Sequence, residues 1–561
     1  MSGRVENRPL SSDLSGSIYL ITANGQTLKL PMPSNSPYDP LGWSLPKRIL
    51  AMAVLILYSI IAIMETQAAS LMYPSLTAEF NGKVMSAPRS TRGQLSEPAD
   101  VFRPKPDRPL PDRHTRFNAE YPLFRPRGLP VDSSFGGHRQ TAGLLACVVL
   151  PNSRQYPSVE SFGVLPASQS SNFAGVFGRN SPQRGMASQS LLIVIDLTFI
   201  DERPYALGMF WSLGATGGLL CSKSIPALAA SGWRNFYSAW LFPCLAVLVC
   251  VFFFLPETYF IRPAVAFDGR ILVQSGSEKI QLYDDWEQTV YGKPDNAAQS
   301  EPAPETLWQS IVRRWGVRKS GAGFREMWTC YMQTMLCVCN PLVFWVAILN
   351  ALNFGALLLI GETYAAVMAE PPYSLPERVI SLVNPVSAIG SLLAWPVSAI
   401  LTSRVARRLT LRNGGVRDAE HYLVAFLPPV LAGAGSVILY GLTVQQKWNF
   451  IWIFVAYVVN AFSSAAFGIA STLWVTEAFP HWAAPAMVIV GGAGYMLSFA
   501  TSSAVTPWLK SQGYMGASLE YGGVLLLVGA VAVPLAFCGK RLRQYIHGRW
   551  GLSQAGALRP Q

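Results

Sequence analysis

Four polar side chains of this chain lie within long apolar stretches, where they are the groups best placed to do chemistry. Asn350 and Asn353 are spaced i and i+3 and therefore share one face of a helix. Asn460 lies about 15 Å into another apolar run at the helical rise. An amide can donate hydrogen bonds to a bound organic molecule and accept them from it. The alternative is an interhelical hydrogen bond, which stabilises packing in a membrane by about 0.6 kcal/mol.

Glu65 is the fourth, and it is the one carboxylate well inside a clear apolar run of the first half. It lies about 24 Å from the start of a helix that begins near Ile49. Acids inside a membrane are usually functional, and proton exchange is the chemistry that a lone carboxylate can do there. Glu65 is therefore our candidate for proton coupling. The alternative is that it already lies in the outer headgroup region.

The elements that must position these residues are long apolar runs. About 20 apolar residues are needed for a helix to cross the roughly 30 Å of hydrocarbon in a bilayer. Six runs of about this length follow one another in the second half of the chain: residues 342–364, 380–401, 423–442, 450–474, 484–508 and 521–538. We therefore expect a complete six-helix bundle over residues 331–540.

The first half is less regular. Apolar runs occur at residues 49–73, 205–229 and 238–255, whereas residues 86–130 are crowded with Pro and Arg. Each arginine at the centre of a membrane costs about 2.5 to 3.5 kcal/mol even on the mildest scale, so this stretch cannot cross. The expected organisation is a tail (1–45), an N-terminal helix bundle (46–256) with an irregular insert at about 81–190, a cytoplasmic connector (257–330), the C-terminal bundle (331–540) and a second tail (541–561).

The net charge of +12 does not indicate nucleic-acid binding, because the excess lies in loops and in the insert rather than on one amphipathic face. Basic residues of short loops are retained in the cytoplasm. Arg404, Arg407 and Arg408 follow one apolar run, and Lys540 and Arg541 follow the last. Both loops, and with them both termini, are therefore expected in the cytoplasm.

Several separate segments resemble the fungal drug:proton antiporter branch of the major facilitator superfamily. They are Asp39-Pro40-Leu41-Gly42-Trp43-Ser44, Gly232-Trp233-Arg234, Leu255-Pro256-Glu257-Thr258, Pro371-Pro372-Tyr373, Arg404-Val405-Ala406-Arg407-Arg408 with Arg412-Asn413-Gly414-Gly415-Val416-Arg417, Thr506-Pro507-Trp508 and Gly539-Lys540-Arg541-Leu542-Arg543. Each motif is short, but they occur in the family's order and spacing. The resemblance covers about three quarters of the chain.

The resemblance implies an all-α polytopic membrane protein with two bundles, the N-terminal one incomplete here. It implies a multi-pass plasma-membrane carrier that exports a small organic molecule, such as a drug, toxin or fungal secondary metabolite, in exchange for protons. Acids and arginines then form a cytoplasmic gate whose salt bridges break as the bundles rock. The gate candidates are Asp196, Glu202, Arg203, Arg404, Arg407, Arg408 and Glu477. The alternative is that these are solvated loop charges.

The chain also departs from that family. The loop between helices two and three, with its Gly, Asp and Arg signature, has no counterpart, and the glycine motif of helix five survives as Gly214, Gly217 and Gly218 without its proline. Because the motif is associated with antiport in the family, an uptake carrier stays open as an alternative. A truncated remnant that transports nothing is the other.

An enzyme is not expected. The five histidines form no metal or catalytic cluster, and no Gly-Lys-Ser or Gly-Lys-Thr nucleotide loop occurs. We therefore expect no metal and no cofactor. The expected partners are a small-molecule substrate, protons and the lipid bilayer, with no nucleic acid, and the carrier is expected to be a monomer.

Overall fold

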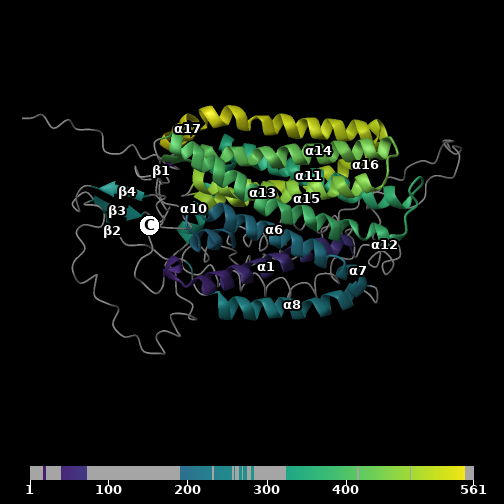
Figure 1. Ribbon diagram of the computed structural model, residues 1–561, viewed down its shortest axis with the longest axis horizontal. Helices are drawn as coiled ribbons and strands as arrows, with labels where there is room; N and C mark the ends of the chain where they lie inside the picture. Colours follow the sequence, from purple (N-terminus) through teal and green to yellow (C-terminus); the bar gives the residue numbers. More distant parts are fainter. Residues whose placement is uncertain are drawn as a thin grey trace, which may run out of the picture.

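Long helices that run side by side form the body of the molecule (Figure 1). The computed structural model describes residues 17–19, 39–71, 190–229, 233–255, 258, 265–267, 270–274, 280–283, 324–413, 416–479 and 482–549. Within them, six helical segments are long and apolar enough to cross a membrane: Leu45–Met64, Pro341–Ala369, Arg378–Arg412, Ala419–Gln445, Ile451–Ala478 and Ala504–Ile546. The predicted all-α polytopic membrane architecture is therefore confirmed. The insert at 81–190, Ser190 apart, lies outside the described residues.

Besides a short helix at 190–196, the described α-helices of the first half are α1 (Leu45–Leu71), α6 (Arg203–Cys221), α7 (Ser224–Ala229) and α8 (Trp233–Phe254). The glycines of the expected helix-five motif face α1. A Cβ atom at Gly214 would lie 2.6 Å from Ser59 Oγ, and one at Gly218 would lie 2.6 Å from Ile63 Cγ2. Small residues at such positions allow two membrane helices to pack closely. The glycine motif thus acts as the surface that joins α6 to α1.

The second half contains α10 (Phe324–Cys339), α11 (Pro341–Ala369), α12 (Glu377–Ile380), α13 (Val383–Arg412), η4 (Ala419–Phe426), α14 (Leu427–Gln445), α15 (Ile451–Ala478), α16 (Ala483–Ala530) and α17 (Ala532–Arg549). Helix α16 contains one of the six predicted apolar runs (484–508) and the first part of another (521–538), which continues into α17. They are separated at Gly513, whose φ of 73° lies in the left-handed region that favours glycine. The chain therefore changes direction there.

Local sequence explains where α11 begins and how closely α13 packs. Asn340 has extended backbone and its Oδ1 accepts a 3.0 Å hydrogen bond from the Leu342 amide, while Pro341 occupies the first helical position. In α13, a Cβ atom at Gly390 would overlap the backbone oxygen of Val458 in α15. The absence of a side chain at Gly390 is thus what lets these two helices touch.

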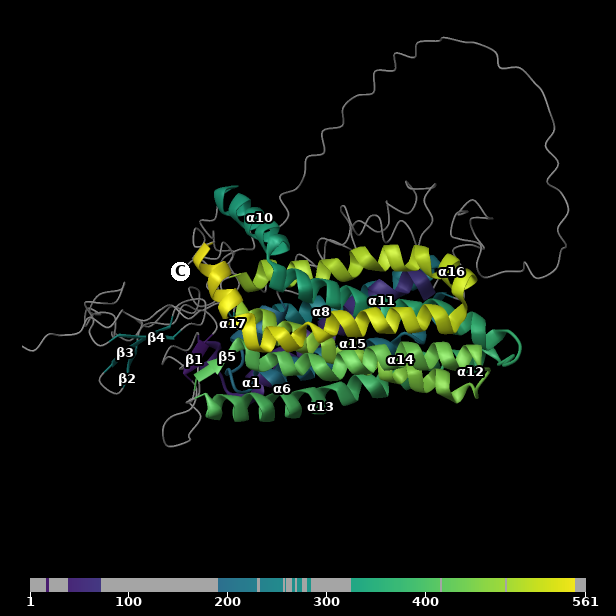
Figure 2. The same ribbon diagram turned by 90° about the horizontal axis from the view of Figure 1, so that it is seen from above.

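Short strands lie at one end of the helices. β1 (Ser17–Tyr19) pairs antiparallel with β5 (Val416–Asp418). β2 (Val265–Phe267), β3 (Arg270–Gln274) and β4 (Ile280–Tyr283) form a three-stranded antiparallel sheet that lies beyond the same end of the helices (Figures 1 and 2). These strands were not predicted. Within the connector the sequence also predicts a short surface helix around residues 307–315, and this stretch lies outside the described residues.

Candidate functional site

A buried ion pair joins the two halves of the chain. Arg203 is the first residue of α6 and Glu477 lies in the last turn of α15, and Arg203 Nη1 donates to Glu477 Oε1 at 3.1 Å. Their side chains are only 4% and 7% exposed. Removing one partner of such a buried pair typically costs about 3 to 5 kcal/mol, because the other charge stays without compensation. The pair therefore holds the start of α6 firmly against the second half.

Arg417 adds a second cation beside Glu477. Its Nη1 donates to the backbone oxygen of Ile200, just before α6, at 3.4 Å, and its guanidinium lies 4.4 Å from the centre of the Tyr422 ring. Burial lowers the pKa of Arg417 to about 10, and the nearby Arg203 acts in the same direction while Glu477 opposes it. Arg417 thus stays charged at neutral pH and forms a second contact between the halves.

A more exposed pair lies on the first half. Arg48 Nη1 in α1 is 3.8 Å from Glu202 Oε2, and the Arg48 guanidinium lies 5.5 Å from the ring centre of Phe199. The side chain of Glu202 is 47% exposed, so this ion pair contributes at most about 1 kcal/mol. We call the end of the molecule that contains Arg48, Arg203 and Arg417 the basic end.

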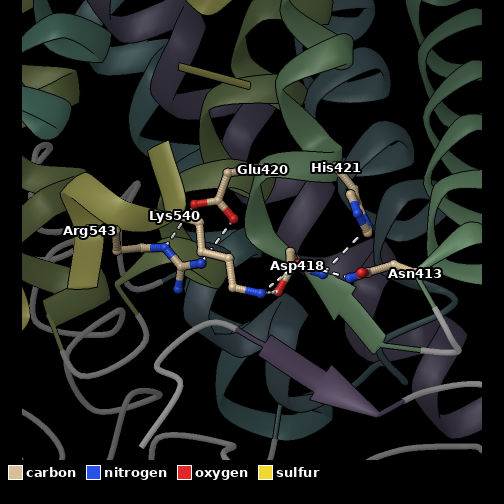
Figure 3. Close-up of polar contacts among 6 residues, drawn as sticks. All are labelled: Asn413, Asp418, Glu420, His421, Lys540 and Arg543. Atoms are coloured by element: carbon tan, nitrogen blue, oxygen red, sulfur yellow. Dashed lines mark hydrogen bonds and ion pairs between the residues drawn. The ribbon is translucent and has the colours of Figure 1, made fainter. Parts of the chain in front are cut away.

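A separate network ties the loop after α13 to α17 at the same end (Figure 3). Arg543 binds Glu420 through two parallel hydrogen bonds of 3.0 and 2.9 Å, and Lys540 reaches both carboxylate oxygens of Asp418 at 3.1 and 3.0 Å. Asn413 donates to Asp418 Oδ2 at 2.9 Å. Because all of these residues belong to the second half, the network stabilises that half itself rather than the contact between the halves.

The N-terminal tail also reaches the second half. In the β1–β5 pair, Ser17 lies opposite Asp418, Ile18 opposite Arg417 and Tyr19 opposite Val416. Strand β5 is thus shared by three contacts: with the tail, with Ile200 through Arg417, and with α17 through Asp418. It is the point at which distant parts of the sequence meet.

The three predicted cavity asparagines lie among the helices of the second half. Asn353 is 4% exposed and its Oδ1 accepts a 2.7 Å hydrogen bond from Ser463 of α15. Asn460 is fully buried and donates to Ser436 Oγ of α14 at 2.9 Å. Asn350 is half-buried and donates to the backbone oxygen of Val490 at 2.8 Å. Each amide therefore makes a bond between helices, which is the alternative that the sequence left open for them.

The predicted gate residues divide into two groups. Glu202, Arg203 and Glu477 come together at the basic end. Asp196 is buried and lies in a short helix at 190–196, a few residues before Glu202 in the sequence. Arg404, Arg407 and Arg408 are exposed on α13. Glu65 lies on α1, but its side chain lies outside the described residues. How these residues act in a transport cycle stays a prediction.

Sequence reasoning did not assign Arg417, Asp418, Glu420, Lys540 or Arg543 to a site. Arg417, Lys540 and Arg543 lie in segments that carried the family resemblance, and Asp418 and Glu420 follow closely after one of them. Glu420 and Arg543 are separated by 123 positions, and no pattern in the sequence pairs them. The burial of Arg417 and Arg543 depends on residues that are distant in the chain, so only the structure shows it.

Comparison with models of known protein families gives no match. The chain is 23% identical over 389 residues to an uncharacterized MFS-type transporter of Schizosaccharomyces pombe, a match that covers 63% of this chain and 65% of that protein. It is 24% identical over 372 residues to Transporter mfs1 of the same yeast, covering 65% and 62%. The chain thus spans slightly less than two thirds of the length of these relatives.

The solved structure of the major facilitator superfamily proton:xylose symporter XylE, bound to 6-bromo-6-deoxy-D-glucose, superposes with a TM-score of 0.50 at 12% identity. The match covers 91% of this chain and all of that one. The chain has the major facilitator fold. This fold consists of two related helix bundles. The contacts of α6 with α13 and α15 are therefore contacts between the bundles of a major facilitator fold.

Two hydrogen bonds continue this contact away from the basic end. Trp211 Nε1 of α6 donates to Thr472 Oγ1 of α15 at 3.1 Å, and Thr216 Oγ1 donates to the backbone oxygen of Ala388 in α13 at 3.4 Å. Thr216 lies 13 residues beyond Arg203 in the same helix, which is about 20 Å at the helical rise. The bundle-to-bundle contact of this major facilitator fold thus follows α6 for most of its length.

Proposed function

We propose that the chain is a secondary transporter of the major facilitator type that moves a small organic molecule across a membrane by alternating access. The observation that carries this proposal is the buried Arg203–Glu477 pair, which joins the two bundles at one end. Alternating access needs such a contact to break at one end of the molecule while another forms at the other end. The relatives named MFS-type transporter and Transporter mfs1 support transport as the general activity.

The basic end is proposed to face the cytoplasm. Lys47, Arg48, Lys540 and Arg541 lie in or beside the contacts at this end, and the loop after α13 adds further arginines. The retention of basic residues on the cytoplasmic side supports this orientation. With this orientation, the conformation described above is the one whose cytoplasmic side is closed.

Opening the cytoplasmic side would separate Arg203 from Glu477 and Arg417 from Ile200. Both guanidinium groups would then meet water, and hydration would offset much of the lost attraction. A salt bridge that is strong while it is buried and weak once water reaches it can stabilise the closed state and still break during the transport cycle. This property makes the Arg203–Glu477 pair, with Arg417 beside it, the proposed cytoplasmic gate.

Export coupled to protons is the direction we favour. It rests on the resemblance of the sequence motifs to fungal drug:proton antiporters and on Glu65 as an acid within α1. The expected cargo class is a drug, toxin or secondary metabolite, and the expected location is the plasma membrane. Uptake through the same gate, with the cargo moving in the same direction as the protons, is the alternative.

The test is a transport assay on the full chain in a yeast strain that lacks its main drug exporters. Cells are loaded with a panel of fluorescent lipophilic cations and uncharged dyes, and retention is measured with and without a protonophore. Energy-dependent loss of at least one dye, abolished by Glu477→Ala and kept by Glu370→Gln, supports the proposal. Glu370 is a matched control, because it is an exposed acid after α11. Equal retention of every dye with and without the chain would contradict export.

A further inference from the structure

Helix α10 has two different faces, and one of them packs against the bundle. Gln333 and Cys337, spaced i and i+4, are 1% and 0% exposed. Leu336 packs beside them against the main hydrophobic core. One side of α10 is therefore fixed to the protein.

The other face of α10 is apolar and exposed. Trp328 is 67% exposed, Tyr331 52% and Met335 63%, and Met332 and Val338 extend the same surface. Their spacing of three and four residues places them along one side of the helix. An apolar stripe of this length on an exposed helix indicates a surface that another medium or molecule covers.

The place of α10 in the fold favours lipid as that cover. Figure 2 shows α10 at the basic end, at an oblique angle to the spanning helices rather than in line with them. Asn340 is the one residue between α10 and α11, and on the first turn of α11 Phe344 is 48% exposed. The apolar surface of α10 therefore continues onto the lipid-facing side of a membrane span. Helices that lie in the membrane interface have this mixture of Trp, Tyr and aliphatic side chains.

The charge of the neighbouring sequence indicates which lipids are involved. Arg313, Arg314, Arg318 and Lys319 precede α10, and no acidic residue occurs between Leu307 and Arg325. Basic clusters beside a membrane span attract anionic lipids by about 1 kcal/mol per residue. The structure of that stretch lies outside the described residues, and the proposed contact surface is α10 alone.

We propose that α10 binds an anionic lipid surface: its exposed apolar face lies in the headgroup layer of the leaflet that surrounds the basic end. Because a single capping residue links it to α11, lipid contact at α10 fixes the end of the first helix of the second bundle. This inference depends on the membrane-spanning fold and does not depend on which molecule is transported.

The test uses a fluorescent label whose surroundings can be read directly. Single cysteines are introduced by Trp328→Cys, Met332→Cys or Met335→Cys into a full-length variant without native cysteines, which is placed in vesicles of phosphatidylcholine with phosphatidylserine. Arg412→Cys is the matched control, because Arg412 is exposed on the last turn of α13. Emission is then quenched by a nitroxide carried on the lipid or by iodide in water.

We expect all three α10 labels to be quenched more by the lipid nitroxide than by iodide, with the opposite order at residue 412. The preference should fall when phosphatidylserine is omitted. Quenching by iodide at all three α10 positions would overturn the proposal, because the face would then lie in water. Protection from both quenchers would also overturn it, since the cover would then be protein, such as a second copy of this chain.

Discussion

Arg203 Nη1 lies 3.1 Å from Glu477 Oε1, although 274 positions separate the two residues in the chain. One residue begins α6 in the first bundle and the other ends α15 in the second. Both side chains are almost completely buried, so the attraction between them is little screened by water. This short, buried contact thus joins the two bundles at the basic end, beside the contact of Arg417 with Ile200.

Breaking this pair should loosen the basic end without unfolding the bundles. Glu477→Gln leaves Arg203 without a carboxylate, a loss of about 3 to 5 kcal/mol as long as the arginine stays buried. Separation of the bundles lets Arg203 become hydrated and so reduces that cost. We therefore expect a water-soluble thiol reagent to label a cysteine introduced at the basic end faster in Glu477→Gln than in the same protein with Glu477. Circular dichroism should show unchanged helix content.

The exchange Arg203→Glu with Glu477→Arg checks that this effect comes from the pair itself. It should restore part of the protection that each single change removes. Equal labelling of the wild type, Glu477→Gln and the exchanged variant would mean that the pair does not close the basic end.

The two ion pairs of the second half should differ in strength. Arg543 and Glu420 are 1% and 8% exposed and share two parallel hydrogen bonds, whereas Lys540 is 38% exposed. We expect Arg543→Gln to cost about 3 to 5 kcal/mol and Lys540→Gln at most about 1 kcal/mol. Thermal unfolding of the purified protein in detergent measures both. A larger loss of Tm for the lysine variant would be inconsistent with these burial values.

The asparagines should separate into packing and binding roles. Asn353→Ala removes one of the two acceptors within reach of Ser463 Oγ, the other being the backbone oxygen of Pro429. It should lower the Tm, because the hydrogen bond between α11 and α15 is lost. Asn460 Oδ1 is buried and has no hydrogen-bond partner among the described residues. A buried acceptor without a partner costs about 1 to 3 kcal/mol. Removing it should offset the loss of the Asn460–Ser436 hydrogen bond, so Asn460→Leu should leave the Tm nearly unchanged.

Transport by the same variants decides whether Asn460 also binds cargo. Loss of export by Asn460→Leu at unchanged Tm would identify Oδ1 as a group that accepts a hydrogen bond from the transported molecule. Export equal to that of the wild type would leave Asn460 as a packing residue.

Glu65→Gln should abolish uphill export while the protein stays in the membrane. The amide keeps the shape of the side chain but cannot carry a proton, so cargo movement would no longer depend on the proton gradient. Dye retention with and without a protonophore measures this, and Glu370→Gln serves as control. Export that is unchanged in Glu65→Gln would remove Glu65 from the mechanism.

The tail strand makes a prediction that needs no substrate. Directly opposed residues in an antiparallel pair have Cα atoms about 4.5 to 5.5 Å apart, within the range that a disulfide bridges. Tyr19→Cys with Val416→Cys, in the variant without native cysteines, should therefore form an intramolecular disulfide under mild oxidation. Tyr19→Cys with Lys510→Cys should not, because Lys510 is exposed near the turn inside α16, far along the chain from β5. If neither variant, or both, were crosslinked, the β1–β5 pairing would not be supported.

The spanning helices could be predicted because their signal is local. The predicted apolar runs of the second half fall on the observed helices, although the run at 423–442 begins in η4 and the run at 521–538 continues from α16 into α17. The turn inside α16 coincides with the polar residues around Lys510 and Gly513. The break between α6 and α7 was missed, because only Ser222 and Lys223 separate two apolar stretches, which were therefore read as one run. The β1–β5 pair was missed because three-residue strands have too few residues to show an alternating pattern.

The site could be predicted only where charge and position coincided. Arg203 and Glu477 stand at helix ends in segments that resemble a known family, and they meet. Arg404, Arg407 and Arg408 have the same charge and a similar resemblance, yet they lie exposed on α13. Arg417 donates to the backbone oxygen of Ile200. Every residue has a backbone oxygen, so the sequence could not indicate this partner.

Spin labels at Tyr205→Cys and Arg412→Cys, which are exposed near the basic ends of α6 and α13, would measure the separation of the two bundles directly. Alternating access predicts two distance populations in double electron–electron resonance, with Glu477→Gln shifting the distribution toward the longer one. A single short distance that is the same in the wild type and in Glu477→Gln would contradict a gate at this end.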